Sequence, residues 1–106
     1  MTNLGGASAT EAAAFLRMMA NEHRLAILCA LGEGATSVGE LAELLGASQP
    51  NVSQHLAKLK SLRLVEAQRE GTTVRYSLVS KDAAAIIAVL HRRYCVDRPV
   101  RKRRVA

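Results

Sequence analysis

A run of hydrogen-bonding side chains between positions 48 and 60 carries the clearest chemistry in this chain. It combines amides, hydroxyls, an imidazole and cations without a carboxylate: Ser48, Gln49, Asn51, Ser53, Gln54, His55, Lys58 and Lys60. Such groups hydrogen-bond base edges and phosphates in the major groove of DNA. The run therefore predicts a contact with double-stranded DNA, although His55 could equally serve packing or bind phosphate.

The two cysteines, Cys29 and Cys95, are the other groups that could do chemistry. A permanent structural disulfide is not expected in a cytoplasmic protein, because the thiol pool keeps cysteines reduced. If both cysteines function, they function as a switch. The cations Arg92 and Arg93, with His91, would favour the nucleophilic thiolate of Cys95. The alternative is that each cysteine is a small buried hydrophobe.

Two short helices over residues 37–62 would position the polar run. Ser37 followed by Glu40 is a capping-box pattern, and Gly46 is the expected left-handed stop of the first helix. Ser48 can cap the second helix, whose first turn tolerates Pro50. The residues expected to face inward are Val38, Leu41, Leu44 and Leu45, then Val52, Leu56, Leu59 and Leu62. Two such helices with a glycine turn predict a helix-turn-helix.

Residues 64–69 and 73–78 are two short runs rich in Val, Thr and Tyr, with Glu, Gly and Thr between them. This pattern predicts a hairpin. A two-stranded ribbon directly after a recognition helix is a wing. Arg69, Arg75 and Tyr76 are then placed to reach phosphate or the minor groove.

Three further helices should flank this unit, capped by Thr10, Asn21 and Ser80. The first is apolar nearly all round, so it must bury more than one face and should pack on a second subunit. The predicted fold is mainly α, a homodimeric winged helix-turn-helix in the order α-α-α-α-β-β-α.

A chain of 106 residues is expected to form one domain. Its net charge is +6, but residues 92–106 alone carry seven cations and one Asp, so the remainder is neutral. We expect a disordered N-terminus (1–9), a winged helix-turn-helix domain (10–95) and a basic C-terminal tail (96–106). A cytoplasmic protein without membrane contact is expected, because the longest purely apolar run, 83–90, is far shorter than a bilayer span.

The segments NEHRLAILCAL, SVGELAELLGASQPNVSQHLAKLKSLRLV and REGTTVRYSL resemble the ArsR family of bacterial winged-helix repressors. The resemblance covers residues 10–95, and SQPNVSQHLAKL is its most specific part. It implies a homodimer joined through its first and last helices. Such a dimer binds a palindromic operator and releases it when an inducer binds.

The metal-sensing patterns of the family fail at particular positions. The arsenic-type site resembles a Cys-x-Cys pair in the first helix of the helix-turn-helix, where this chain has no thiol. For the zinc-type site, Asp82 and His91 could supply half of the ligands, but their partners fall at Ala84 and Tyr94. No metal site, cofactor or catalytic site is therefore expected. A Cys/His hydrolase lacks a third orienting group.

The pairing of ILCAL with HRRYC is similar to the persulfide-sensing branch of the family, the SqrR and BigR type. In that branch the reduced protein holds its operator, and a disulfide or sulfur-bridged link between two cysteines releases it. The resemblance implies that reactive sulfur species link Cys29 to Cys95. A metal-responsive repressor, or an oxidant-sensing repressor using the same cysteines, remains the alternative.

Overall fold

The computed structural model describes residues 5–94. Within that range the elements are α1 (Ala7–Met19), α2 (Glu22–Glu33), β1 (Thr36–Ser37), α3 (Val38–Leu45), α4 (Gln49–Ser61), β2 (Val65–Glu70), β3 (Thr73–Leu78) and α5 (Lys81–Tyr94). This order confirms the predicted mainly helical, winged helix-turn-helix fold, with one added strand. β1 pairs antiparallel with β3, so the sheet has the order β1-β3-β2. A two-residue strand is too short to produce an alternating apolar pattern, which explains why the sequence did not indicate it.

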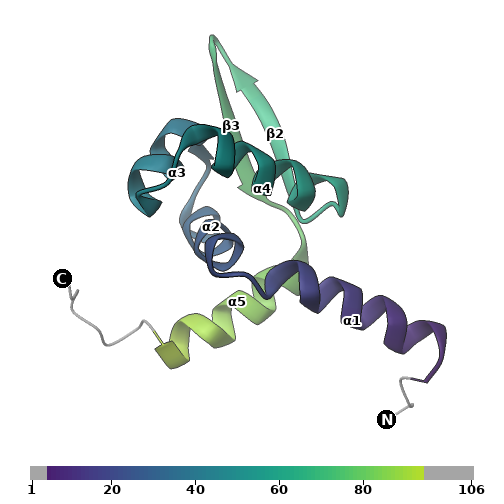
Figure 1. The fold of residues 1–106 in the computed structure, drawn as a ribbon. Coiled ribbons are helices and arrows are strands. Elements are labelled where there is room, and N and C mark those ends of the chain that lie inside the picture. Colours follow the sequence, from purple (N-terminus) through teal and green to yellow (C-terminus); the bar gives the residue numbers. More distant parts are fainter. Residues whose placement is uncertain (1–4, 95–106) are drawn as a thin grey trace.

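Helix α2 lies at the centre of the core and packs against all four other helices and β3. Its buried side chains are Ile27, Leu28 and Leu31. They pack with side chains of the other elements: Met19, Leu41, Ala42, Val52, Leu56, Leu59, Leu64, Val65, Ala83 and Ile87. One central helix thus connects the helix-turn-helix to the terminal helices α1 and α5 (Figure 1).

The predicted caps fix most helix boundaries. Ser37 and Glu40 form the complete capping box of α3, and Gly46 ends that helix with φ 65°. Ser48 accepts the Asn51 backbone N–H at the start of α4. Asn21 and Ser80 accept backbone N–H groups in the same way at the starts of α2 and α5. Short polar side chains therefore determine where these helices begin, as expected.

Helix α1 begins at Ala7, not at Thr10 as predicted. The Thr10 hydroxyl donates to the Gly6 carbonyl instead of capping the helix, and Gly6 adopts φ 62° at the N-cap. A disordered N-terminus was predicted over residues 1–9, and this prediction is wrong for residues 7–9, which are helical. Residues 1–4 and the predicted tail, 96–106, lie outside the described residues.

Two leucines predicted to face inward are exposed. Leu44 is 68% exposed, because the short helix α3 buries Leu41 and Ala42 instead. Leu62 is 45% exposed, because α4 ends at Ser61 and Arg63 turns the chain with φ 63°. The Leu64 N–H then donates to the Leu59 carbonyl, and Leu64 fills the buried position.

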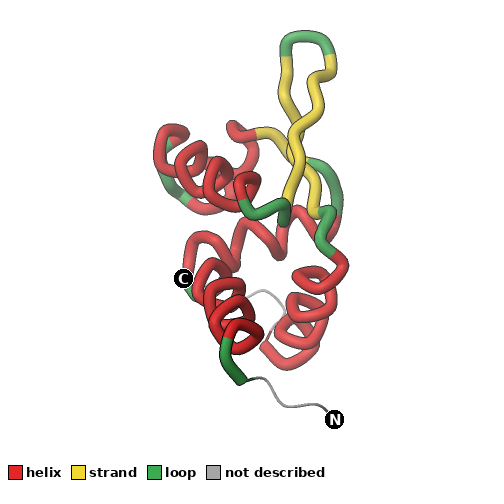
Figure 2. Tube along the Cα trace, turned by 90° about the vertical axis from the view of Figure 1, so that its right-hand side faces the viewer, coloured by secondary structure: helices red, strands yellow, loops and turns green. Residues whose placement is uncertain are grey.

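The β2–β3 hairpin projects beyond α3 and α4, while α1 and α5 lie on the opposite side of the molecule (Figures 1 and 2). Its register places Arg69 opposite Val74 and Glu70 opposite Thr73, and Gly71 turns the chain with φ 65°. No helix within residues 5–94 is long and apolar enough to cross a membrane. The fold therefore has one end formed by the helix-turn-helix and wing and another formed by the terminal helices.

Candidate nucleic-acid interface and thiol site

Helix α4 separates its apolar and polar side chains into two faces. Val52, Leu56 and Leu59 are buried against the core. The predicted DNA-contacting residues that are exposed on or beside α4 are Ser48, Gln49, Asn51, Ser53, Gln54 and Lys58. They place amides, hydroxyls and a cation on one short helix, and these groups can hydrogen-bond base edges in a major groove.

His55 is set apart from these residues, because it is half-buried between α4 and α2. Arg24 Nη1 lies 3.4 Å from His55 Nδ1, and the His23 ring meets the His55 ring edge to face at 5.6 Å. Burial lowers the pKa of His55, and the nearby Arg24, His23 and Lys58 lower that pKa further. His55 therefore belongs to a contact between helices, the packing role that the sequence left open.

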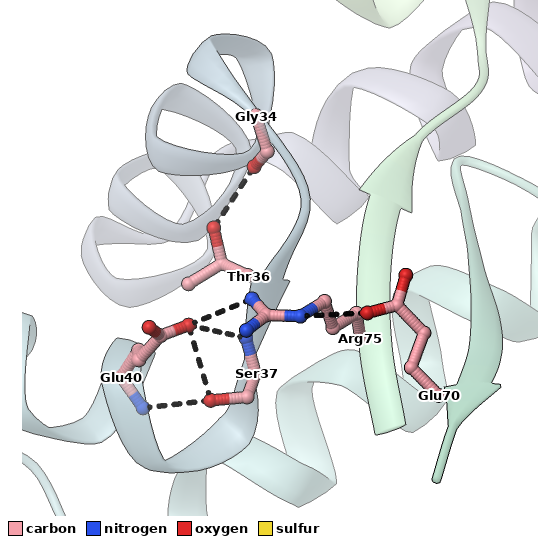
Figure 3. A network of polar contacts seen from close by, with 6 residues as sticks. All are labelled: Gly34, Thr36, Ser37, Glu40, Glu70 and Arg75. Atoms are coloured by element: carbon pink, nitrogen blue, oxygen red, sulfur yellow. Dashed lines mark hydrogen bonds and ion pairs between the residues drawn. The ribbon is translucent and has the colours of Figure 1, made fainter. Parts of the chain in front are cut away.

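The three predicted wing residues, Arg69, Arg75 and Tyr76, differ in their surroundings. Arg69 is exposed on β2 near the tip of the hairpin. Tyr76 is half-buried and packs against the core, opposite Thr36 and Ala67. The Arg75 guanidinium lies between two carboxylates, with Nη1 3.2 Å from Glu40 Oε1 and Nε 3.2 Å from Glu70 Oε1 (Figure 3). Of the three, Arg69 alone is exposed.

The Arg75–Glu40 ion pair joins the wing to the start of α3, whereas the Arg75–Glu70 pair lies within the wing. Glu40 Oε1 also accepts the Ser37 backbone N–H at 3.1 Å, and its carboxylate therefore completes the capping box and pairs with the wing at once. The Ser37 backbone N–H, then the Ser37 hydroxyl and Arg75, hold the pKa of Glu40 below its ordinary value. The sequence indicated Glu40 as a cap, but its role as an ionic partner, like that of Glu70, was missed.

Cys29 lies on α2, facing α5. It is half-buried, packs against the core, and borders two hollows. One, of about 450 Å³, is also lined by Glu33, Leu78, Ile87, His91 and Arg92. The other, of about 310 Å³, is apolar and extends along Ile87 and Leu90 to Tyr94. Cys29 thus shares its surroundings with the last turns of α5.

Cys95 lies outside the described residues, directly after Tyr94 in the sequence. At the end of α5, His91 is half-buried and Arg92 and Arg93 are exposed. Within residues 5–94 there is no group of three or more His, Cys, Asp or Glu side chains that could hold a metal ion.

Comparison with known proteins decides the family. The profile described as "Bacterial regulatory protein, arsR family" matches residues 21–67. The transcriptional activator HlyU of Vibrio cholerae is 47% identical over 88 residues, which cover 83% of this chain and 82% of HlyU. The chain belongs to the ArsR family.

Solved structures of this family have the same fold. Reduced HlyU from Vibrio cholerae is 46% identical, with a TM-score of 0.79 over 83% of this chain and 93% of that chain. The transcriptional repressor BigR from Xylella fastidiosa is 35% identical, with a TM-score of 0.76 over 83% of this chain and 90% of BigR. This ArsR-family chain is accordingly a DNA-binding transcriptional regulator and not an enzyme.

Proposed function

We propose that this ArsR-family regulator is a homodimeric repressor that releases its palindromic operator when reactive sulfur species link Cys29 to Cys95. The observation that carries the proposal is the position of Cys29 on α2, where it faces the last turns of α5 that lead into Cys95. The likeness to BigR, a repressor, and to HlyU, whose structure is of a reduced form, supports this reading.

The hollow beside Cys29 suits a sulfur-transfer reaction. His91 and Arg92 line it together with the thiol. A cation such as Arg92 beside a cysteine favours the thiolate that acts as the nucleophile, whereas Glu33 in the same lining opposes it. Leu78 and Ile87 supply apolar walls that can receive a small sulfur compound. Cys29 also packs against the core. In the alternative interpretation, Cys29 is only a small buried hydrophobe, and His91 and Arg92 have no part in its chemistry.

The chemistry needs no oxidant besides the persulfide itself. The thiolate of one cysteine attacks the outer sulfur of a persulfide RSSH, takes that sulfur and expels RS⁻. The second thiolate then attacks the inner sulfur of the new protein persulfide, forming a disulfide and expelling HS⁻. If both cysteines are first converted to persulfides, their condensation gives a trisulfide and H₂S. A direct disulfide requires Cα atoms within about 7 Å, whereas inserted sulfur spans a wider gap.

The packing of α2 offers a route from the link to DNA. α2 contacts α5 on one side and both helices of the helix-turn-helix on the other. A bridge from Cys29 to the end of α5 would restrain the angle between these elements and shift the recognition helices. A hundredfold loss of operator affinity requires only about 2.7 kcal/mol of differential stabilisation.

The terminal helices support the homodimer. Leu16 on α1 and Val89 and Tyr94 on α5 are each more than half exposed. Large apolar side chains gathered at one end of a small protein are typical of an interaction surface. In such a dimer the two α4 helices should lie roughly 34 Å apart, which places them in successive major grooves.

Mass spectrometry before and after treatment with a persulfide donor tests this proposal. We expect the peptides containing Cys29 and Cys95 to become joined, with the mass of a disulfide or of added sulfur, while operator binding falls. Treatment with zinc and with hydrogen peroxide in parallel separates the two alternatives. Release of the operator by zinc, with no joined peptides after persulfide, would replace the thiol switch by a metal sensor. Release by peroxide alone would indicate an oxidant sensor.

A further inference from the structure

Arg24 connects the end of α1 to the recognition helix α4. Its Nε donates to the Met18 backbone carbonyl in the last turn of α1. Its Nη1 lies 3.4 Å from Nδ1 of His55 in the middle of α4. The Arg24 backbone N–H donates to the Asn21 side chain at 3.0 Å, which fixes the residue at the start of α2. The guanidinium of Arg24 therefore contacts both α1 and α4, while its backbone N–H is held by the N-cap of α2.

The contact between Arg24 and His55 requires a particular protonation state. A guanidinium has only donors, so His55 Nδ1 must be the acceptor and the ring must be neutral, with its proton on Nε2. A second proton on His55 would remove the acceptor and place a cation against the Arg24 guanidinium. The hydrogen bond therefore exists only while His55 is neutral.

The other groups around His55 also disfavour its cation. Among the described residues, the charges that act on it are Arg24 and His23 from α2 and Lys58 from α4 itself. No carboxylate of α3 or β2 is among them. Burial and these cations lower the pKa of His55. Every identified influence on the ring therefore favours the neutral form that accepts from Arg24.

We propose that Arg24 is a positioning residue that holds the recognition helix through neutral His55, so that operator binding weakens when His55 is protonated. This inference rests on the proposed contact between α4 and the operator, and it does not involve the thiol switch. The Arg24–His55 contact connects the junction of α1 and α2 to the recognition helix. Gln54, the residue before His55 in the sequence, is exposed on that helix.

The expected pH dependence has the opposite sign to that of a histidine that binds phosphate. A phosphate-binding histidine strengthens DNA binding as it becomes protonated, because it gains a charge complementary to the backbone. A histidine that accepts from Arg24 weakens binding on protonation, because the link to α2 is lost. The sign of the pH profile therefore distinguishes the two roles of His55.

Fluorescence anisotropy with operator DNA at about pH 7.5 and about pH 5.5 tests the proposal on the full chain. We expect binding by the wild type to weaken as the pH falls through the His55 pKa, by about three- to tenfold once the ring is fully protonated, which is the effect of losing one hydrogen bond. His55→Asn places an amide oxygen near the position of Nδ1 and does not titrate, so its affinity should match the wild type at pH 7.5 and stay there. Arg24→Gln should bind weakly at both values. His23→Gln should keep a pH dependence of the same sign, with its midpoint at a higher pH because one of the groups that lower the His55 pKa is gone.

NMR titration of the imidazoles tests the link without DNA. The His55 pKa should lie below that of a free histidine in the wild type and should rise in Arg24→Gln. Tighter binding of the wild type at the lower pH, an unchanged pH dependence in His55→Asn, or an unchanged His55 titration in Arg24→Gln would overturn the proposal. If the first two occur while persulfide still releases the operator, the proposed function stands and only the role of Arg24 fails.

Discussion

Arg75 Nη1 on the wing lies 3.2 Å from Glu40 Oε1 at the start of the helix-turn-helix. The same oxygen accepts the Ser37 backbone N–H, so one carboxylate completes the cap of α3 and pairs with β3 (Figure 3). Glu70 binds the other side of the guanidinium. The orientation of the wing relative to α3 is thus tied to a charged group and not to apolar packing alone.

Glu40→Gln should reduce the pH dependence of stability. The pKa of Glu40 is lowered from 4.5, chiefly because its carboxylate accepts the Ser37 backbone N–H. A lowered pKa contributes stability that is present above the unfolded value and is lost as pH falls through the folded value. The wild-type melting temperature should therefore fall below about pH 4.5 more steeply than that of Glu40→Gln, whose amide oxygen still accepts from Ser37. Parallel melting curves across this range would argue against a role for the charge.

Arg69 and Arg75 should differ in how they affect DNA binding. Arg69 is exposed, so Arg69→Gln should weaken binding to all sequences and reduce the slope of log affinity against log salt by about one. Arg75 is paired with two carboxylates, so Arg75→Gln should leave that slope unchanged and act through the orientation of the wing. Salt titrations of both variants on operator and random DNA measure this. Equal changes in slope would mean that Arg75 leaves its carboxylates for phosphate.

Gln54→Ala should lose preference for the operator over random DNA. Gln54 is exposed on the polar face of α4, where an amide can form a bidentate contact with a base edge. The expected loss is about 1–3 kcal/mol on the operator alone. Lys58→Ala is the matched control, because a lysine that contacts phosphate should lower both affinities alike. Equal losses for Gln54→Ala on the two DNAs would show that it positions the helix without reading a base.

Val89→Glu should disrupt the proposed dimer. Val89 is 53% exposed on α5, and a carboxylate there would be buried without a partner on dimerisation. Analytical ultracentrifugation should show a monomer, and operator affinity should fall because the two half-sites are no longer bound together. Leu44→Glu, at an exposed apolar position on α3, should remain dimeric. Dimeric Val89→Glu would place the interface elsewhere.

The local signals in the sequence were sufficient for the helix-turn-helix. Capping by Ser37, Ser48 and Ser80 and the left-handed Gly46 depend on neighbouring residues only, so the sequence predicted them correctly. Thr10 failed as a cap because Gly6 supplied an earlier start for α1.

Contacts between distant segments were not predictable in the same way. The position of Arg75 follows from β1, whose Ser37 lies opposite Arg75 in the sheet, and a two-residue strand leaves no pattern to detect. Arg24 and His55 meet only because α2 and α4 pack together, and neither residue type indicates that partner. The cysteine pair remains a prediction, since Cys29 is placed at the α2–α5 contact while Cys95 lies outside the described residues.

Operator binding by the single variants Cys29→Ser and Cys95→Ser, before and after a persulfide donor, tests the central claim most directly. Both variants should bind the operator like the reduced wild type, because serine preserves the fold and removes only the nucleophile. After treatment the operator affinity of the wild type should fall about a hundredfold, and the affinity of neither variant should change. Release of the operator by either single variant on persulfide treatment would contradict a switch that links Cys29 to Cys95.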